Sequence, residues 1–526
     1  MATEPEAKRS EARHGPLTPA ARRRQPAPQP PPPDGDPAPP HGQPAPPGPE
    51  PAWDLSDELL GLEASPGRVD AYRYGEPRPA PARPPRARPP VRAPAPLPRA
   101  LERRAPAVIS IGLVALAVLL QLASVVSSLS AGGPGAITVN PSLAVVAPGG
   151  RIAFEGAGAP AGAELVLETR RRGRAWLPLG EARADDNGDF RVEGRVVAAP
   201  GRAAMRVRAV GGSAASTPTA VTVRPLRLAS VGDINLGDAP GAAIEAEGPR
   251  YPWESAGRPL READIAFGNL ECAISLRGTP FLKQYNFRGT PEALAGLRRH
   301  AGIDVLNLAN NHVGDFGRTA LLDTVRNVER LGMRAVGAGP GLRRALRPQV
   351  VEKLGLRVAF VGFSNILPLE FAAAQGRPGV AWATPEAVAA TVRAARQRAD
   401  VVVATFHWGI EKAFYETADQ AELARVAADA GAQLVIGAHP HVLQPVRREG
   451  SALVAYSLGN FVFGAQSAET ASTGVLQTDL SSEGVTAARW RPGEISGGRP
   501  LLAEGRPQRL PVGDPDAMGF GLTLGS

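Results

Sequence analysis

Cysteine is almost absent from this sequence of 526 residues, where Cys272 is the only one. A single cysteine cannot form an intramolecular disulfide, and its isolation excludes the zinc modules that several cysteines build. The fold therefore does not depend on oxidation. Because Cys272 lies in an apolar stretch, we expect a small buried side chain there rather than a nucleophile.

Lysine is also scarce, so the positive charge comes mainly from arginine. The formal net charge is +8, but acidic and basic residues are interspersed along the part of the chain with globular composition. A nucleic-acid-binding surface is typically a block of lysine and arginine with interleaved aromatic residues, and the sequence has no such block. We therefore predict no nucleic-acid partner.

Large apolar residues are rare before residue 106, where more than half of the 55 prolines lie. Such a segment cannot bury enough surface to offset the entropy of ordering it. Residues 1–105 are therefore predicted to be a disordered tail rich in proline, alanine and arginine, with polyproline II character.

The next segment has no charged residue from Ala107 to Leu129. It is long enough to span the ~30 Å hydrocarbon core of a membrane as a helix. Three arginines precede it, the last of them Arg104, and the next charge is Arg151, which by the positive-inside rule places the N-terminus in the cytoplasm. A cleaved signal peptide would not follow about 100 residues of tail, and a buried core helix is disfavoured because the segment is both apolar all round and flanked by linkers. We predict a single-pass membrane helix over 106–130, with the rest of the chain extracytoplasmic.

Short runs of apolar and β-branched residues recur over residues 135–225, such as Glu164-Leu-Val-Leu-Glu. Turn signals such as Asp186-Asn-Gly separate them at spacings of roughly eight to twelve residues. This pattern predicts a small all-β domain of the immunoglobulin-like kind. It carries no set of chemically reactive residues, so we interpret it as a spacer or adhesion module.

From Leu226 the sequence alternates between apolar strand-like runs and segments of helical periodicity, which predicts an α/β domain with a largely parallel sheet. Helices are expected at 291–300, 317–331, 385–398 and 420–430. Strands are expected again after Gly464. The domain is predicted over 226–505, with a loose C-terminal tail at 506–526.

Metal-competent side chains follow the ends of five predicted strands in this domain. They are Asp233, Glu271, the run Asn310-Asn311-His312, His407, and the pair His439 and His441. In open α/β sheets, ligand sites lie at the carboxyl ends of strands. This placement therefore predicts one shared site.

The distribution of histidine supports that prediction. Only 7 histidines are present, and four of them stand at these strand ends. One such histidine would usually be structural, but four with neighbouring carboxylates and amides indicate a metal site. His439 and His441 are two apart, so in an extended segment both would face the same side. Imidazole, carboxylate and amide donors suit Zn²⁺, Mn²⁺ or iron, and there are enough of them for two divalent ions.

The motifs of the domain are, in chain order, Gly232-Asp233, Gly268-Asn269-Leu270-Glu271, Asn310-Asn311-His312 with Asp315, His407-Trp408-Gly409, Gly437-Ala438-His439-Pro440-His441 and Tyr456-Ser-Leu-Gly-Asn-Phe-Val-Phe. Together they resemble those of the CapA family of poly-γ-glutamate capsule synthesis proteins, within the calcineurin-like metallophosphoesterase superfamily. The resemblance covers about residues 226–464. It implies a four-layer α/β/β/α metallophosphatase-like sandwich, with two divalent metal ions between the sheets.

The resemblance also implies roles for individual residues. Asp233 and His441 would hold the first metal, with Glu271 as the bridging or near-bridging carboxylate. Asn311, His407 and His439 would hold the second metal. His312 would act as general acid toward the leaving group, with Asp315 orienting it. Because neighbours in an extended chain point in opposite directions, His312 is expected to face away from the metal if Asn311 faces it.

Two positions depart from the superfamily pattern. The opening Asp-x-His is Asp233-Ile-Asn235 here, so a histidine ligand is replaced by an amide or lost. The usual Gly-Asp of the second motif is Gly268-Asn269, with its carboxylate displaced to Glu271. Lys283 and Arg288 could hold an anionic substrate, although a solvated loop explains them equally well.

These features favour an anchored extracytoplasmic protein that works in the synthesis or export of poly-γ-glutamate or a related anionic capsule polymer. Its partners would be that polymer or a phosphoester substrate, and membrane-embedded capsule synthesis proteins. Two alternatives stay open. One is a non-catalytic scaffold subunit that binds the polymer and keeps the metal site for structure. The other is a general extracytoplasmic metallophosphoesterase with no role in the capsule.

Overall fold

The computed structural model describes residues 136–366 and 368–510. The tail predicted at 1–105, the membrane helix predicted at 106–130 and the last residues of the C-terminal tail lie outside these ranges. Within the ranges described, no helix is both long and apolar enough to cross a membrane.

Residues 136–225 form two β-sheets and no helix among the described residues. The strands are β1 (Thr138–Pro141), β2 (Val145–Val146), β3 (Arg151–Ala157), β4 (Glu164–Arg170), β5 (Leu177–Arg183), β6 (Phe190–Arg195), β7 (Gly201–Ala209) and β8 (Thr219–Val223). The sheets have the orders β1-β3-β6 and β2-β8-β7-β4-β5. Every second residue of β7 from Ala203 to Ala209 is buried, so one face of that strand packs on an apolar core shared by both sheets. The all-β prediction is confirmed, while its immunoglobulin-like topology stays a prediction.

A nine-stranded sheet begins the α/β part of the chain. Its path is β14-β13-β10-β9-β24-β25-β26, with β23 also paired to β9 and β27 to β25. Its strands are β9 (Leu226–Ile234), β10 (Ile265–Leu270), β13 (Val305–Asn307), β14 (Arg334–Val336), β23 (Asn460–Val462), β24 (Ser472–Ser481), β25 (Gly484–Ser496), β26 (Arg499–Leu502) and β27 (Gln508–Leu510). The sequence had placed 508–510 in a loose tail, but these residues form a strand because their backbone pairs with β25.

A second sheet of six strands has the order β16-β17-β19-β20-β22-β21. Its strands are β16 (Gln349–Lys353), β17 (Leu356–Ser364), β19 (Val401–His407), β20 (Leu434–Ala438), β21 (Val446–Glu449) and β22 (Ala452–Ala455). The four central strands β17, β19, β20 and β22 are parallel, as the strand–helix alternation predicted. Two small two-stranded sheets pair β11 (Ala273–Ile274) with β12 (Arg288–Gly289), and β15 (Ala338–Gly339) with β18 (Gly379–Val380).

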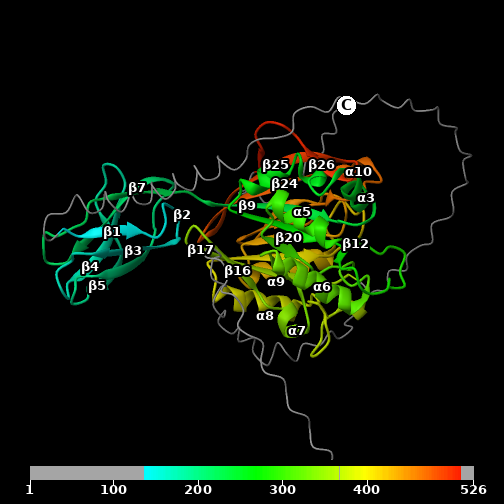
Figure 1. Ribbon diagram of the computed structural model, residues 1–526, viewed down its shortest axis with the longest axis horizontal. Helices are drawn as coiled ribbons and strands as arrows, with labels where there is room; N and C mark the ends of the chain where they lie inside the picture. Colours follow the sequence, from blue (N-terminus) through cyan, green and yellow to red (C-terminus); the bar gives the residue numbers. More distant parts are fainter. Residues whose placement is uncertain (1–135, 367, 511–526) are drawn as a thin grey trace, which may run out of the picture. The chain divides into compact units, whose positions relative to one another are not determined.

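The two large sheets face each other across one apolar core. Its members come from both sheets, and the rings of Phe267 on β10 and Phe360 on β17 stack across it at 6.0 Å. A second core lies between the nine-stranded sheet and α3 (Asp238–Glu247), α4 (Gly257–Arg261), α5 (Pro291–Ala301) and α6 (Gly317–Arg330). A third joins the six-stranded sheet to α7 (Leu342–Ala345), α8 (Pro385–Arg396) and α9 (Ala418–Asp429), with α8 and α9 lying side by side (Figure 1). Helices therefore cover the outer face of each sheet.

The helix limits follow from local chemistry. The hydroxyls of Thr290 and Thr384 cap α5 and α8, and a proline occupies the first turn of each. Thr417 and Gln420 form a capping box at the start of α9. The four long helices expected from the sequence are confirmed, with ends that differ from the expected ones by one or two residues. Short elements complete the fold at η1 (Tyr251–Trp253), η2 (Leu369–Phe371) and α10 (Ala468–Ala471).

Candidate metal centre

Asp233 lies near the end of β9 and is fully buried. Its Oδ1 accepts a hydrogen bond from Nδ2 of Asn269 at 2.8 Å, and its Oδ2 accepts one from the backbone N–H of His439 at 3.2 Å. Nδ1 of His441 lies 3.3 Å from the same Oδ2. Burial raises the pKa of Asp233, but the contacts with His441 outweigh burial and hold this pKa below its ordinary value. Asp233 is therefore an ionised carboxylate that links the strand ends of the two sheets.

Glu271 follows the last residue of β10 and is also fully buried. One of its oxygens, Oε1, lies 3.3 Å from Nε2 of His407, 3.8 Å from Nε2 of His441 and 3.9 Å from Nε2 of His312. Among the described residues, neither carboxylate oxygen of Glu271 has a hydrogen-bond partner. Burial raises the pKa of Glu271, and the nearby charge of Asp233 raises it further. A buried carboxylate in this condition is costly unless a cation neutralises it.

His407 ends β19 and faces the loop that follows β13. Its Nε2 lies 2.8 Å from Oδ1 of Asn311, and its Nδ1 lies 3.2 Å from Nδ2 of Asn269. The side chain of Asn310 shapes this loop. Its Oδ1 accepts hydrogen bonds from the backbone N–H groups of His312 and Val313, and its Nδ2 donates to the carbonyl of Leu270. The side chain of Asn310 thus places Asn311 beside His407.

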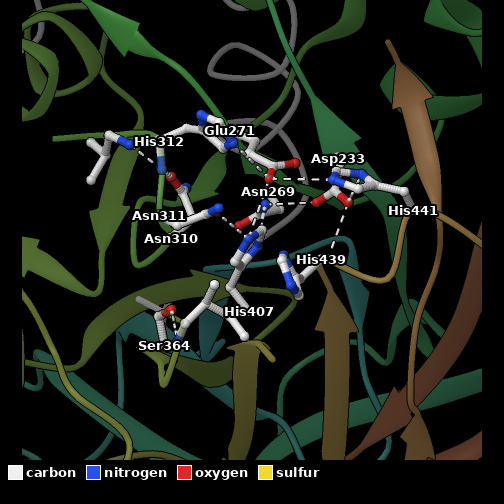
Figure 2. A network of polar contacts seen from close by, with 12 residues as sticks. Asp233, Asn269, Glu271, Asn310, Asn311, His312, Ser364, His407, His439 and His441 are labelled. Carbon is white, nitrogen blue, oxygen red and sulfur yellow. Dashed lines mark hydrogen bonds and ion pairs between the residues drawn. The ribbon is translucent and has the colours of Figure 1, made fainter. Parts of the chain in front are cut away.

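His439 and His441 follow β20 in a bent segment, where the sequence had predicted an extended one. Their φ angles are 96° and 58°, in the left-handed region that such residues rarely adopt. Each costs of order 1–3 kcal/mol, a strain that is typical of functional sites. Both rings nevertheless lie in the cluster, with centroids 5.9 Å apart (Figure 2). Nδ1 of His441 also lies 2.9 Å from Oδ1 of Asn460, so Nδ1 is held by two oxygens and Nε2 is the ring nitrogen that faces Glu271.

These side chains form two groups that could each hold an ion. One group is Asp233, Glu271 and His441, and the other is Glu271, His407 and His439; within each, the candidate ligand atoms lie within 4.8 Å of one another. The two groups share Glu271, as the resemblance implied for a bridging carboxylate. The unpartnered atoms of the site also fit metals, because both oxygens of Glu271 and Nδ1 of the buried His439 lack hydrogen-bond partners among the described residues.

His312 lies on the opposite side of Glu271 from His441 (Figure 2). Its Nδ1 is 2.7 Å from Oδ2 of Asp315, and its ring stacks on Phe287 at 4.0 Å. The backbone at Asn311 and His312 is bent and leads into a turn, so the alternation argument for their opposite directions does not apply. Asp315 directs the ring instead, and leaves Nε2 turned toward the cluster.

Lys283 is joined to this pair from an adjacent loop. Its Nζ lies 2.6 Å from Oδ1 of Asp315, 3.1 Å from Nδ1 of His312 and 2.6 Å from the backbone oxygen of Asn311. Burial raises the pKa of Asp315 to about 7, against the opposing charge of Lys283. Burial and the charge of Lys283 hold the pKa of His312 well below its ordinary value. Lys283 therefore has a positioning role at the site besides any contact with a substrate.

Arg288 is not among the side chains that the fold brings to the cluster. Its Nη2 donates to the backbone oxygens of Arg277 and Gly278 at 3.1 Å, and its guanidinium stacks over the ring of Phe316. These contacts bind Arg288 to its own loop. Its expected role in substrate binding therefore gains no support from the geometry.

Residues 227–465 match the model of a family described as "Bacterial capsule synthesis protein PGA_cap". The PGA biosynthesis protein CapA of Bacillus subtilis is 32% identical over 257 residues, which cover 48% of this chain and 67% of the relative. The chain belongs to this family. The capsule biosynthesis protein CapA of Bacillus anthracis is 29% identical, with 52% of this chain and 69% of that protein covered. A probable polyglutamine synthesis accessory protein of Mycobacterium tuberculosis is 32% identical, with 40% of this chain and 60% of that protein covered.

Two features of this PGA_cap site were not found from the sequence. Asn460 lies beside Asp233 in the β23–β9 pairing and holds His441, although its motif had been noted without a role. Glu411 lies within reach of His439 and His441, only four residues after His407. At Asn235, which departs from the superfamily pattern, the side-chain Oδ1 accepts a hydrogen bond from the N–H of Gly237 at 2.8 Å and closes a local turn. Cys272 is buried as predicted, and burial raises its pKa to about 12.

The glycine before Asp233 is a test of how closely this PGA_cap site is packed. A Cβ added at Gly232 would lie 1.9 Å from the backbone oxygen of Gly459, so β9 and β23 would have to separate. We expect Gly232→Ala to destabilise the protein by roughly 1–3 kcal/mol and to lower its metal content. The matched control is Gly464→Ala, where an added Cβ meets nothing within 4 Å. Thermal unfolding and metal analysis would measure the stability and the metal content of both variants. Equal stability and equal metal content in the two would contradict the prediction.

Proposed function

We propose that this protein acts in the synthesis or export of poly-γ-glutamate, or of a related anionic capsule polymer, through a two-metal site of the hydrolase type. Membership of the PGA_cap family supports the capsule role. The observation that supports the chemistry best is the pair of donor groups that share the unpartnered carboxylate of Glu271.

Each metal position would be held by residues from both sheets. The first would use Asp233, Glu271 and His441, and the second Glu271, His407, His439 and Asn311. Mn²⁺, iron or Zn²⁺ suits this mixture of imidazole, carboxylate and amide donors. When bound, such a pair would supply Lewis acidity for attack on a phosphoester or an amide.

His312 would deliver the proton that the leaving group needs. Asp315 orients the ring through its contact with Nδ1, so Nε2 faces the cluster and is the atom that would have to carry the proton for the leaving group. Lys283 fixes Asp315 and brings a positive charge toward an anionic substrate. The stacking of Phe287 on His312 keeps the ring in this orientation.

A scaffold subunit that binds the polymer without catalysis is the second candidate. The observation that favours it is Asn235, whose side-chain oxygen serves a local turn and leaves the first metal position with three donors from the motifs. Fewer protein donors at one position would weaken its metal, and loss of that metal would leave a site that binds without turnover. A general metallophosphoesterase without a capsule role is the third candidate.

Loss of the gene from its own host, followed by complementation, would test the proposal. Cells without the protein should lose cell-associated γ-glutamyl polymer, and the wild-type gene should restore it. If the site is catalytic, a His312→Ala gene should fail to restore the polymer although the protein is present. Restoration by His312→Ala would favour the scaffold, and unchanged polymer in the deletion strain would favour the phosphoesterase without a capsule role.

We also propose that the catalytic domain is anchored outside the cell membrane by the segment predicted at 106–130. The charge asymmetry around that segment supports this topology. Protease added to intact cells should digest the α/β domain and spare the first hundred residues. Digestion of the N-terminal tail instead would overturn the topology.

A further inference from the structure

The motifs of the family supply fewer donor side chains to the first metal position than to the second. The second has four donors, because Asn311 adds its oxygen to Glu271, His407 and His439. The first has three, and Asn235, which stands where the superfamily has a histidine, is held in its turn by Gly237. A metal of this class takes four ligands or more, and a catalytic site usually leaves one position to water, so any fourth protein donor at the first position must come from outside these motifs.

Glu411 is a carboxylate at the edge of this position. Its side chain forms a third group with His439 and His441, again with ligand atoms within 4.8 Å of one another. Its loop is tied to the histidine segment, because the backbone N–H of Lys412 donates to the carbonyl of Pro440 at 2.7 Å. Lys412 has a φ of 63°, so the backbone next to Glu411 adopts a strained conformation where its loop contacts the histidine segment.

A further observation points to a ligand between these side chains. Only 3% of the surface of His439 is exposed, yet its Nδ1 has no hydrogen-bond partner among the described residues.

We propose that Glu411 is a protein ligand of the first metal, beside Asp233, Glu271 and His441, in place of the histidine that Asn235 replaces. This inference rests on the proposed two-metal site. Glu411 is exposed and belongs to a loop, so the buried core would not have to rearrange for its carboxylate to bind an ion. It comes from the loop directly after β19, so β19 and this loop together would contribute to both metals, through His407 to the second and through Glu411 to the first.

Glu411→Gln tests the inference, because it keeps the shape of the side chain and removes its charge. The purified full-length protein, stripped by a chelator, would be titrated with Mn²⁺ alone, and bound metal would be measured by calorimetry and elemental analysis. We expect two ions per wild-type chain. In the variant, one of the two should bind more weakly by at least about tenfold, since even residues that only support a ligand cost ~10–100-fold.

Glu422→Gln is the matched control, since Glu422 is an exposed glutamate on α9 outside the candidate groups. It should bind Mn²⁺ as the wild type does. The electron paramagnetic resonance signal of coupled Mn²⁺ ions should weaken only in Glu411→Gln. If both variants match the wild type with two ions bound, Glu411 is no ligand and the metal centre stands. If the wild type binds no Mn²⁺, Zn²⁺ or iron, the metal centre and this inference both fail.

Discussion

Replacement of His312 by alanine is expected to lower metal-dependent turnover by a factor of ~10²–10⁴, the usual contribution of a general acid, while metal content is unchanged. The physical reason is that His312 lies beside the proposed bridging carboxylate of Glu271 without belonging to the ligand groups. Nε2 of His312 is 3.9 Å from Oε1 of Glu271, and its Nδ1 is held by Asp315. The candidate ligand groups do not include His312.

The measurement is turnover of a phosphoester or polymer substrate by protein whose metal content has been determined in the same sample. Asp315→Asn offers a matched comparison, because it keeps the shape of the orienting side chain and should lower kcat more than it changes KM. His439→Ala should behave differently and lose metal. An empty site in His312→Ala would make this histidine a ligand, and unchanged turnover would remove it from the reaction.

Replacement of Glu271 by glutamine should abolish the stabilisation that metal gives to the protein. In the wild type, an ion at 100 times its Kd should raise the free energy of unfolding by about 2.7 kcal/mol, and by more for two ions. Because Glu271 belongs to both candidate groups, the variant should lose most of this gain at both positions. Its metal content should fall toward zero.

The same variant should be no less stable than the wild type when metal is absent. Burial and the charge of Asp233 both disfavour the ionised form of Glu271, and neither of its oxygens has a hydrogen-bond partner among the described residues. Thermal unfolding of the stripped proteins, with and without added Mn²⁺, gives the stability of the metal-free protein and the stability that Mn²⁺ adds. A metal-free variant that melts well below the wild type would show that Glu271 has a structural role, and an unchanged rise with Mn²⁺ would show that it is no ligand.

The sequence was informative wherever a local pattern carries the information. The capping threonines and prolines of α5 and α8 mark where those helices begin, and their apolar spacing marks the buried face. Apolar runs predicted the buried strands β19 and β20, because such strands are covered on both faces. The burial of Cys272 followed from its apolar neighbours.

Local reasoning failed where the backbone leaves regular structure. His439 and His441 were expected to share a side because of an extended chain, but both adopt left-handed φ angles that a residue pattern does not reveal. The loop at Asn311 is shaped by hydrogen bonds of Asn310 to its own backbone and to Leu270. Arg288 was a candidate for substrate binding on charge alone, and its contacts with Arg277 and Gly278 give that role no support.

By itself, the sequence determined that this chain would contain an α/β domain with metal-competent residues at five strand ends, because apolar periodicity and the residue after each strand are local properties. Only the tertiary structure decided how the donors are shared. The face-to-face packing of two sheets brings Asp233 against the N–H of His439 and turns three imidazole rings toward Glu271. It also brings Glu411 and Asn460 to the histidines. Those distances depend on how separate strands and loops meet in space, and no pattern along one segment carries that information.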